Sequence, residues 1–130
     1  MNEAVRTLLN STLWDLATVS AAGEPNVVPV AFKSVTDEGH LLVGDVFLDT
    51  TLQNIKANGR IAVSAFDGAH LTGYQIKGHA KYIEDGPIVD AFKKAVEDMF
   101  KGATTAKGAL EIIPEKIIVT TPGPDNKKEL

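Results

Sequence analysis

The chain has 130 residues, of which 44% are hydrophobic and 23% charged, with a formal net charge of −4. This size and composition suit one globular domain over residues 1–130, with a hydrophobic core of its own. The acidic balance disfavours a broad nucleic-acid surface, and no stretch approaches the roughly 20 apolar residues that a membrane span needs.

Cysteine is absent from the chain. Disulfides, thiol catalysis and thiolate metal sites are therefore excluded. The first residues, MNEAVRTLLNSTLW, contain an early acidic residue and no long apolar run, so they make a poor signal peptide. These features together predict a cytoplasmic protein.

The first third of the chain predicts one short helix and two strands. Helical spacing of apolar residues predicts a helix over Asn2–Leu9. Alternation of apolar and polar residues predicts strands over Leu13–Ser20 and Asn26–Val35. Pro29 lies inside the second strand, and because proline cannot donate a ladder hydrogen bond, it indicates a sheet edge or an interruption there.

Further strands follow between glycine-rich turns. The expected segments are His40–Val46, Arg60–Phe66, Leu71–Glu84, Leu110–Ile113 and Lys116–Thr121. Gly73 and Gly78 interrupt the longest of them and mark candidate bulges.

A further, longer helix is expected to begin at Pro87 and to end at Gly102. Its apolar stripe consists of Ile88, Phe92, Val96 and Met99–Phe100. About six short strands with two or three helices predict a mainly β domain with peripheral helices. Short turns favour antiparallel pairing, and the glycine bends favour a barrel.

The stretch Val43–Gly59 carries the strongest local signal. Its pattern predicts the end of a strand, then a short connection, and then an amphipathic helix that ends at Gly59. Thr50 and Gln53 fit a capping box, in which each side chain bonds a free amide at the helix start. A helix N-terminus also suits a phosphate, although most capping boxes only close a helix.

No self-contained catalytic apparatus is visible. The histidines His40, His70 and His79 have no metal-ligand spacing and no acidic helper at a fixed offset, so no metal site is expected. Nucleophile elbows, Walker loops and dinucleotide fingerprints are absent. These absences favour a binding domain, or an enzyme whose chemistry a bound cofactor performs.

Four segments, in order and at matching spacing, carry a resemblance over nearly the whole chain. They are NVVPVAFKSV, LLVGDVFLDTTLQNIKANGRIAVSAFD, GYQIKGHAKYIEDGP and TTPGPDNKKEL. The chain resembles the pyridoxamine 5′-phosphate oxidase-related FMN-binding proteins. The resemblance implies a split barrel of six antiparallel strands, built as a homodimer with FMN at the subunit interface.

The resemblance also implies which residues contact the flavin. Its ring contacts fall on one strand and on the connection before the central helix, and its phosphate contacts fall at the start of that helix. In chain order these residues are Val28, Pro29, Val30, Asp45, Val46, Phe47, Thr50, Thr51 and Asn54.

One position departs from the family pattern. Related proteins commonly carry a lysine at the position of Thr50, and a threonine hydroxyl supplies no charge to a phosphate. Weaker FMN affinity follows, unless Lys33, Lys56, Arg60 or a partner subunit supplies the charge. The departure leaves deazaflavin F420 open as an alternative cofactor, whereas haem has no well-placed axial ligand.

The resemblance implies an FMN-dependent oxidoreductase, similar to flavin reductases, that takes hydride from a nicotinamide donor. Oxidation of pyridoxamine phosphate is not expected, because the chain has only Arg6 and Arg60 for a substrate phosphate. The alternatives are a non-catalytic flavin-binding or electron-carrier protein, an F420 binder, and a barrel that has lost its cofactor.

Overall fold

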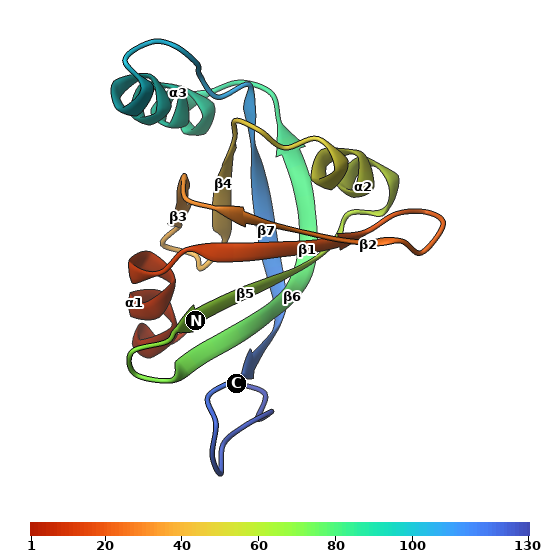
Figure 1. Cartoon of the computed structure of the whole chain (residues 1–130), viewed down its shortest axis with the longest axis vertical. Coiled ribbons are helices and arrows are strands. Elements are labelled where there is room, and N and C mark those ends of the chain that lie inside the picture. Colours follow the sequence, from red (N-terminus) through yellow and green to blue (C-terminus); the bar gives the residue numbers. More distant parts are fainter.

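The computed structural model of the chain covers residues 1–130 (Figure 1). Three helices and seven strands follow one another along it. In chain order they are α1 (Glu3–Ser11), β1 (Trp14–Val19), β2 (Pro25–Val30), β3 (Lys33–Val35), β4 (Leu41–Asp45), α2 (Thr50–Asn58), β5 (Arg60–Asp67), β6 (Thr72–Ile83), α3 (Pro87–Phe100) and β7 (Gly108–Val119).

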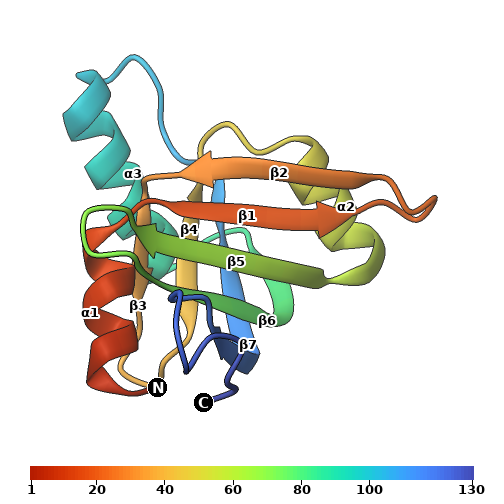
Figure 2. The same ribbon diagram turned by 60° about the horizontal axis from the view of Figure 1, so that its bottom comes forward.

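All strands join one sheet in the order β2-β1-β5-β6-β7-β4-β3, and every pairing is antiparallel. The sheet curls around an interior, with α1 and α2 at opposite ends of β1 (Figures 1 and 2). The predicted mainly β, antiparallel split barrel is confirmed. None of the three helices is long and apolar enough to cross a membrane.

The barrel has seven strands where six were predicted, because the strand expected over Asn26–Val35 breaks in two. Val30 still pairs with β1, whereas Lys33 already pairs with β4 on the far edge of the sheet. Residues 31–32 thus carry the chain from one sheet edge to the other. Pro29 lies on the edge strand β2, where its missing amide costs no ladder bond on the open side.

The two segments predicted at the end of the chain form one strand, β7. Its register against β6 shifts between Lys77 and Gly78, so the bulge lies on β7, opposite Gly78, and not at the glycine itself. Gly73 makes no bulge, since its register with β5 continues unbroken. A side chain at Gly73 would collide with the Phe66 ring, so close packing explains this glycine.

The core has two parts. The larger part fills the barrel interior, where Val5 and Leu9 of α1 pack near Trp14, all fully buried. The smaller part lies between α3 and the outer face of β4, where Phe92 packs against Gly44. The buried face of α3 differs from the predicted apolar stripe at both ends. Val89, which the stripe did not include, is buried, and Met99, which it did include, is 66% exposed.

We expect Gly78→Ala to lower the free energy of unfolding by about 1–3 kcal/mol, the usual cost of overpacking. The added methyl group would meet the Ile113 carbonyl of the neighbouring strand. Gly68→Ala is the matched control, because no atom lies within 4 Å of a methyl group there. Urea unfolding of both variants measures the difference, and equal stabilities would contradict the packing constraint.

Candidate cofactor-binding site

A cleft of about 390 Å³ lies where β2 leaves the sheet edge beside the connection from β4 to α2. Its lining contains no charged side chain and consists of Val28, Pro29, Val30, Ala31, Phe32, Gly44, Val46, Phe47 and Leu48. The fold thus brings together five of the nine residues to which the resemblance assigned flavin contacts. A cleft of this size and character accommodates a flat apolar ring.

The edge strand β2 adds polar groups to this apolar cleft. It pairs only with β1, so every second backbone amide and carbonyl on its other side has no ladder partner. Pro29 is the exception, because it has no amide hydrogen. The unpaired groups are suited to hydrogen bonds with the polar edge of a ring lying in the cleft.

Aromatic side chains border the cleft. Phe47 is 76% exposed, and its ring meets that of Phe100 edge-on, with centroids 6.3 Å apart. The Phe100 ring also lies 6.1 Å from that of Phe32. The end of α3 therefore reaches the cleft, which the sequence did not indicate, since Phe32 and Phe100 lie far apart in the chain.

A buried polar cluster lies between α2 and the first two strands. The Asn26 amide donates to the Thr51 hydroxyl at 3.0 Å, and the Asn54 amide donates to the Thr18 hydroxyl at 3.0 Å. Sequence reasoning missed Thr18 and Asn26. Their pairing across the β1–β2 turn could have revealed them, because Thr18 stands directly opposite Asn26.

The predicted capping box at the start of α2 is wrong. Asp49, not Thr50, occupies the cap position, and no side chain bonds the first amides of the helix. Gln53 instead donates its side-chain amide to the Asp49 carboxylate at 2.9 Å. Thr51 faces inward to Asn26, so the first turn is held by the barrel. The exposed Thr50 and the uncapped amides present a polar surface suited to an anion.

Asp45 is one of four predicted contacts that do not line the cleft; the other three, Thr50, Thr51 and Asn54, lie on α2. Side chains alternate along β4, so Asp45 faces the barrel interior while Gly44 and Val46 face the cleft. One Asp45 carboxyl oxygen accepts a 2.8 Å hydrogen bond from the Tyr82 hydroxyl, and the other has no partner. Burial, together with Asp45, raises the pKa of Tyr82 to about 12.

The cations considered as substitutes for a lysine at Thr50 all lie outside the cleft. Lys33 donates to the Leu9 carbonyl at 2.9 Å and lies 5.1 Å above the Trp14 ring, beside α1. Partial burial lowers the pKa of Lys33. Lys56 lies above the Tyr82 ring, and Arg60 lines a different hollow.

Each histidine has a carboxylate partner in the fold, although the sequence shows no acidic helper at a fixed offset. The contacts are His40 with Glu111 at 2.8 Å, His70 with Asp67 at 2.7 Å and His79 with Glu115 at 2.9 Å. Two of the pairs join residues far apart in the chain, which no fixed offset can reveal. No group of three or more metal-ligating side chains forms.

We expect Tyr82→Phe to lower the free energy of unfolding at neutral pH by about 1–3 kcal/mol, because it leaves the buried Asp45 carboxyl group without a partner. The raised pKa means that Tyr82 stabilises the fold below pH 10, and that this contribution is lost as the pH rises towards about 12. The variant should therefore lose less stability over that interval.

Thermal unfolding followed by circular dichroism across this pH range tests both effects. Tyr74→Phe is the matched control, because it removes a hydroxyl from the same strand, β6, and leaves the Tyr82–Asp45 bond in place. A Tyr82 variant as stable as this control would refute the assigned role.

Comparisons with known proteins agree with the geometry. Residues 1–122 match the family described as pyridoxamine 5′-phosphate oxidase. MJ0282 of Methanocaldococcus jannaschii, a protein without an assigned function, is 32% identical over 97% of this chain and 84% of its own. HupZ from Group A Streptococcus is 27% identical, with a TM-score of 0.82 over 96% of this chain and 98% of HupZ.

Two more distant solved structures share the fold. An FMN-binding protein from Syntrophomonas wolfei is 18% identical, with a TM-score of 0.81 over 94% of this chain and 87% of that one. A structure named F420 reductase is 22% identical, with a TM-score of 0.69 over 90% and 98%. By the match over nearly its whole length and by its split-barrel fold, the chain belongs to the pyridoxamine 5′-phosphate oxidase family.

Proposed function

We propose that the chain binds FMN in the cleft between β2 and the connection from β4 to α2, and that it is a flavin-dependent oxidoreductase. The observation that carries the proposal is the cleft itself, which joins an uncharged apolar lining to an uncapped helix start. Family membership supports the proposal, as does the shared fold with a protein named for FMN binding.

The residues present fit the two ends of the cofactor. Val28, Val30 and Val46 would pack against the isoalloxazine ring, whose polar edge would meet unpaired backbone groups of β2. The Thr50 hydroxyl and the first amides of α2 would bind the phosphate. The Thr51–Asn26 hydrogen bond holds this helix start in place.

The bound flavin would supply the redox chemistry, accepting hydride from a donor such as a nicotinamide. The chain's own side chains would position the ring and keep water from one of its faces, because the cleft lining is apolar. No acid or base of this chain lines the cleft. The residues therefore bind and orient the ring without transferring protons to it.

We further propose that two copies of the chain associate over the cleft. Phe47 lies at the cleft and is 76% exposed, and its ring contacts that of Phe100, which is 38% exposed. Contiguous exposed apolar groups mark surfaces that a partner covers. A second copy would also enclose the open side of the ring and supply charge near the phosphate.

F420 is the second candidate cofactor, favoured by the shared fold with the structure named F420 reductase. It presents a tricyclic ring and a phosphate to the same cleft. A flavin carrier without substrate turnover is the non-catalytic alternative.

Absorbance and mass spectra of the cofactor released by denaturing the purified protein test the assignment. We expect FMN, a dimer by light scattering, and bleaching of the bound flavin on addition of NADH or NADPH. Bound flavin that no nicotinamide reduces would favour the carrier, and released F420 would replace FMN. A colourless protein that also binds neither added cofactor would refute the proposal.

Thr50→Lys is expected to tighten FMN binding about 2- to 30-fold at low salt. A charged partner contributes about 1.5–3 kcal/mol to a phosphate, against about 1 kcal/mol for a neutral hydroxyl. Ala57→Lys is the control, because it adds the same charge to an exposed position at the opposite end of the same helix. Quenching of FMN fluorescence gives both affinities, and equal gains would mean that only overall charge changed.

Pyridoxamine phosphate is not expected to be oxidised by the FMN-loaded protein. Arg6 is bound to the carbonyls of Thr36 and Asp37, and Arg60 lies outside the cleft, so neither serves a substrate phosphate there. An assay for hydrogen peroxide and pyridoxal phosphate decides the matter. Turnover above the rate of free FMN would show that the cleft accepts this substrate.

A further inference from the structure

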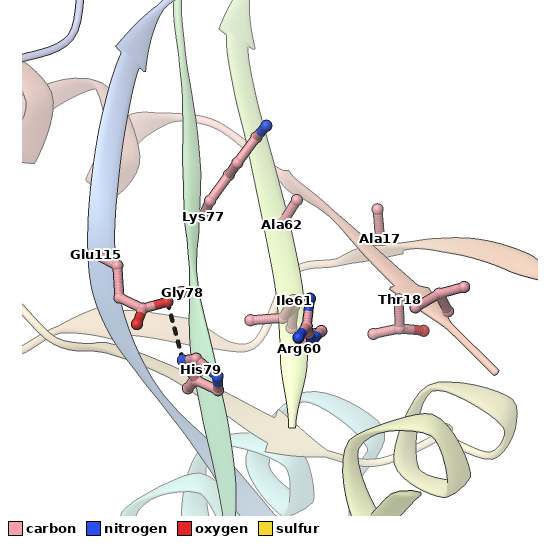
Figure 3. Close-up of a pocket in the computed structure, with 10 residues that line it drawn as sticks. Ala17, Thr18, Arg60, Ile61, Ala62, Lys77, Gly78, His79 and Glu115 are labelled. Atoms are coloured by element: carbon pink, nitrogen blue, oxygen red, sulfur yellow. Dashed lines mark ion pairs between the residues drawn. The ribbon is translucent and has the colours of Figure 1, made fainter. Parts of the chain in front are cut away.

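A second hollow, of about 470 Å³, lies on the outer face of the sheet, where β1, β5 and β6 run side by side (Figure 3). It shares no lining residue with the cleft described above. Small residues leave room for it, because Ala17 pairs directly with Ala62 and Gly78 follows on the next strand. The hollow is also lined by four ionisable side chains, Arg60, Lys77, His79 and Glu115.

The hollow carries an excess of positive charge in a chain whose net charge is −4. Arg60 and Lys77 have no carboxylate within 4.0 Å, and the one acid present, Glu115, is paired with His79. In the sheet register Lys77 stands opposite Lys116, and Arg60 stands opposite His79. The Lys77–Lys116 pair places like charges directly across the ladder, which destabilises a sheet, so the stability of the fold does not account for Lys77 at this position.

The bulge in β7 shapes the same hollow. Lys77 pairs with Lys116 and Gly78 with Pro114, which leaves Glu115 as the extra residue. A bulge re-aims the side chain it carries, and here Glu115 reaches His79 Nδ1 at 2.9 Å (Figure 3). Both side chains of this pair remain more than half exposed, so the His79 ring lies open to a ligand in the hollow.

We propose that this hollow binds a small anion bearing a phosphate group, with Arg60 and Lys77 as its charged partners and His79 at its edge. A phosphate carries up to two negative charges, which matches two cations that have no other partner. Its several oxygens can also accept bonds from donors on two strands at once. The site is separate from the proposed FMN cleft and does not rest on it.

The histidines provide a local measurement, because only His79 lines the hollow. Inorganic pyrophosphate is titrated into the protein at constant ionic strength while the ring signals of all three histidines are followed by NMR. We expect saturable shifts of the His79 signals, with those of His40 and His70 unchanged. The same titration is repeated with FMN at saturation, where the His79 shifts should persist.

Arg60→Gln and Lys77→Gln are each expected to weaken pyrophosphate binding about tenfold or more. Both side chains are exposed, so the fold should tolerate the changes, and circular dichroism confirms it. Lys94→Gln is the control, because it removes the same charge from an exposed position on α3 and should leave the affinity unchanged.

Three results would overturn the proposal. His79 signals that do not move, or that move together with the other two, would show no specific site. Equal weakening by Lys94→Gln and the two hollow variants would show a general charge effect. Loss of the His79 shifts on saturation with FMN would place the anion in the flavin cleft.

Discussion

The crossing of the chain from one edge of the sheet to the other at residues 31–32 is the constraint on which the rest of the structure depends. The Gly44 amide donates to the Phe32 carbonyl at 2.9 Å and ties this crossing to β4. Because β2 and β3 are the two edge strands of the sheet, this crossing brings the two edges together. The cleft lies along this seam, because the crossing brings Val28–Val30 next to Val46 and Phe47. The site is thus a consequence of how the barrel closes.

Two buried polar contacts hold the cleft walls. The Thr51–Asn26 bond joins α2 to β2, and the Tyr82–Asp45 bond joins β6 to β4. Buried polar groups must be bonded, so each contact restricts where its strand or helix can lie. Asp45 keeps one carboxyl oxygen unpaired, and Gly108 leaves room for the Tyr82 ring. The polar contact of β4 therefore lies on the face opposite the cleft, while the cleft lining has no charged side chain.

The apolar cleft and the charged hollow lie on different parts of the surface and are lined by different residues. The cleft lies along the seam and has no charged side chain, whereas the outer hollow faces away from the barrel and gathers cations. Such separation suits two different kinds of ligand group, a flat ring in the first and an anionic group in the second. The small residues Ala17, Ala62 and Gly78 are as important to the hollow as its charges, because larger side chains would fill it.

The sequence by itself determined the features that depend on neighbouring residues. Alternation placed the strands, Pro29 indicated the sheet edge, Gly59 ended α2 in a left-handed conformation, and the four ordered segments indicated the family. Only the tertiary structure decided what depends on contacts between distant residues. At the start of α2 no capping box forms, and the Asn26 amide donates to the Thr51 hydroxyl. The Asp45 carboxyl group accepts from Tyr82, and Lys33 contacts Trp14 and Leu9. The tertiary structure also joined His79 to Glu115 through a bulge. Local sequence patterns determine the backbone conformation. The partner of a polar side chain depends instead on which residues lie within hydrogen-bond distance of it in the folded chain.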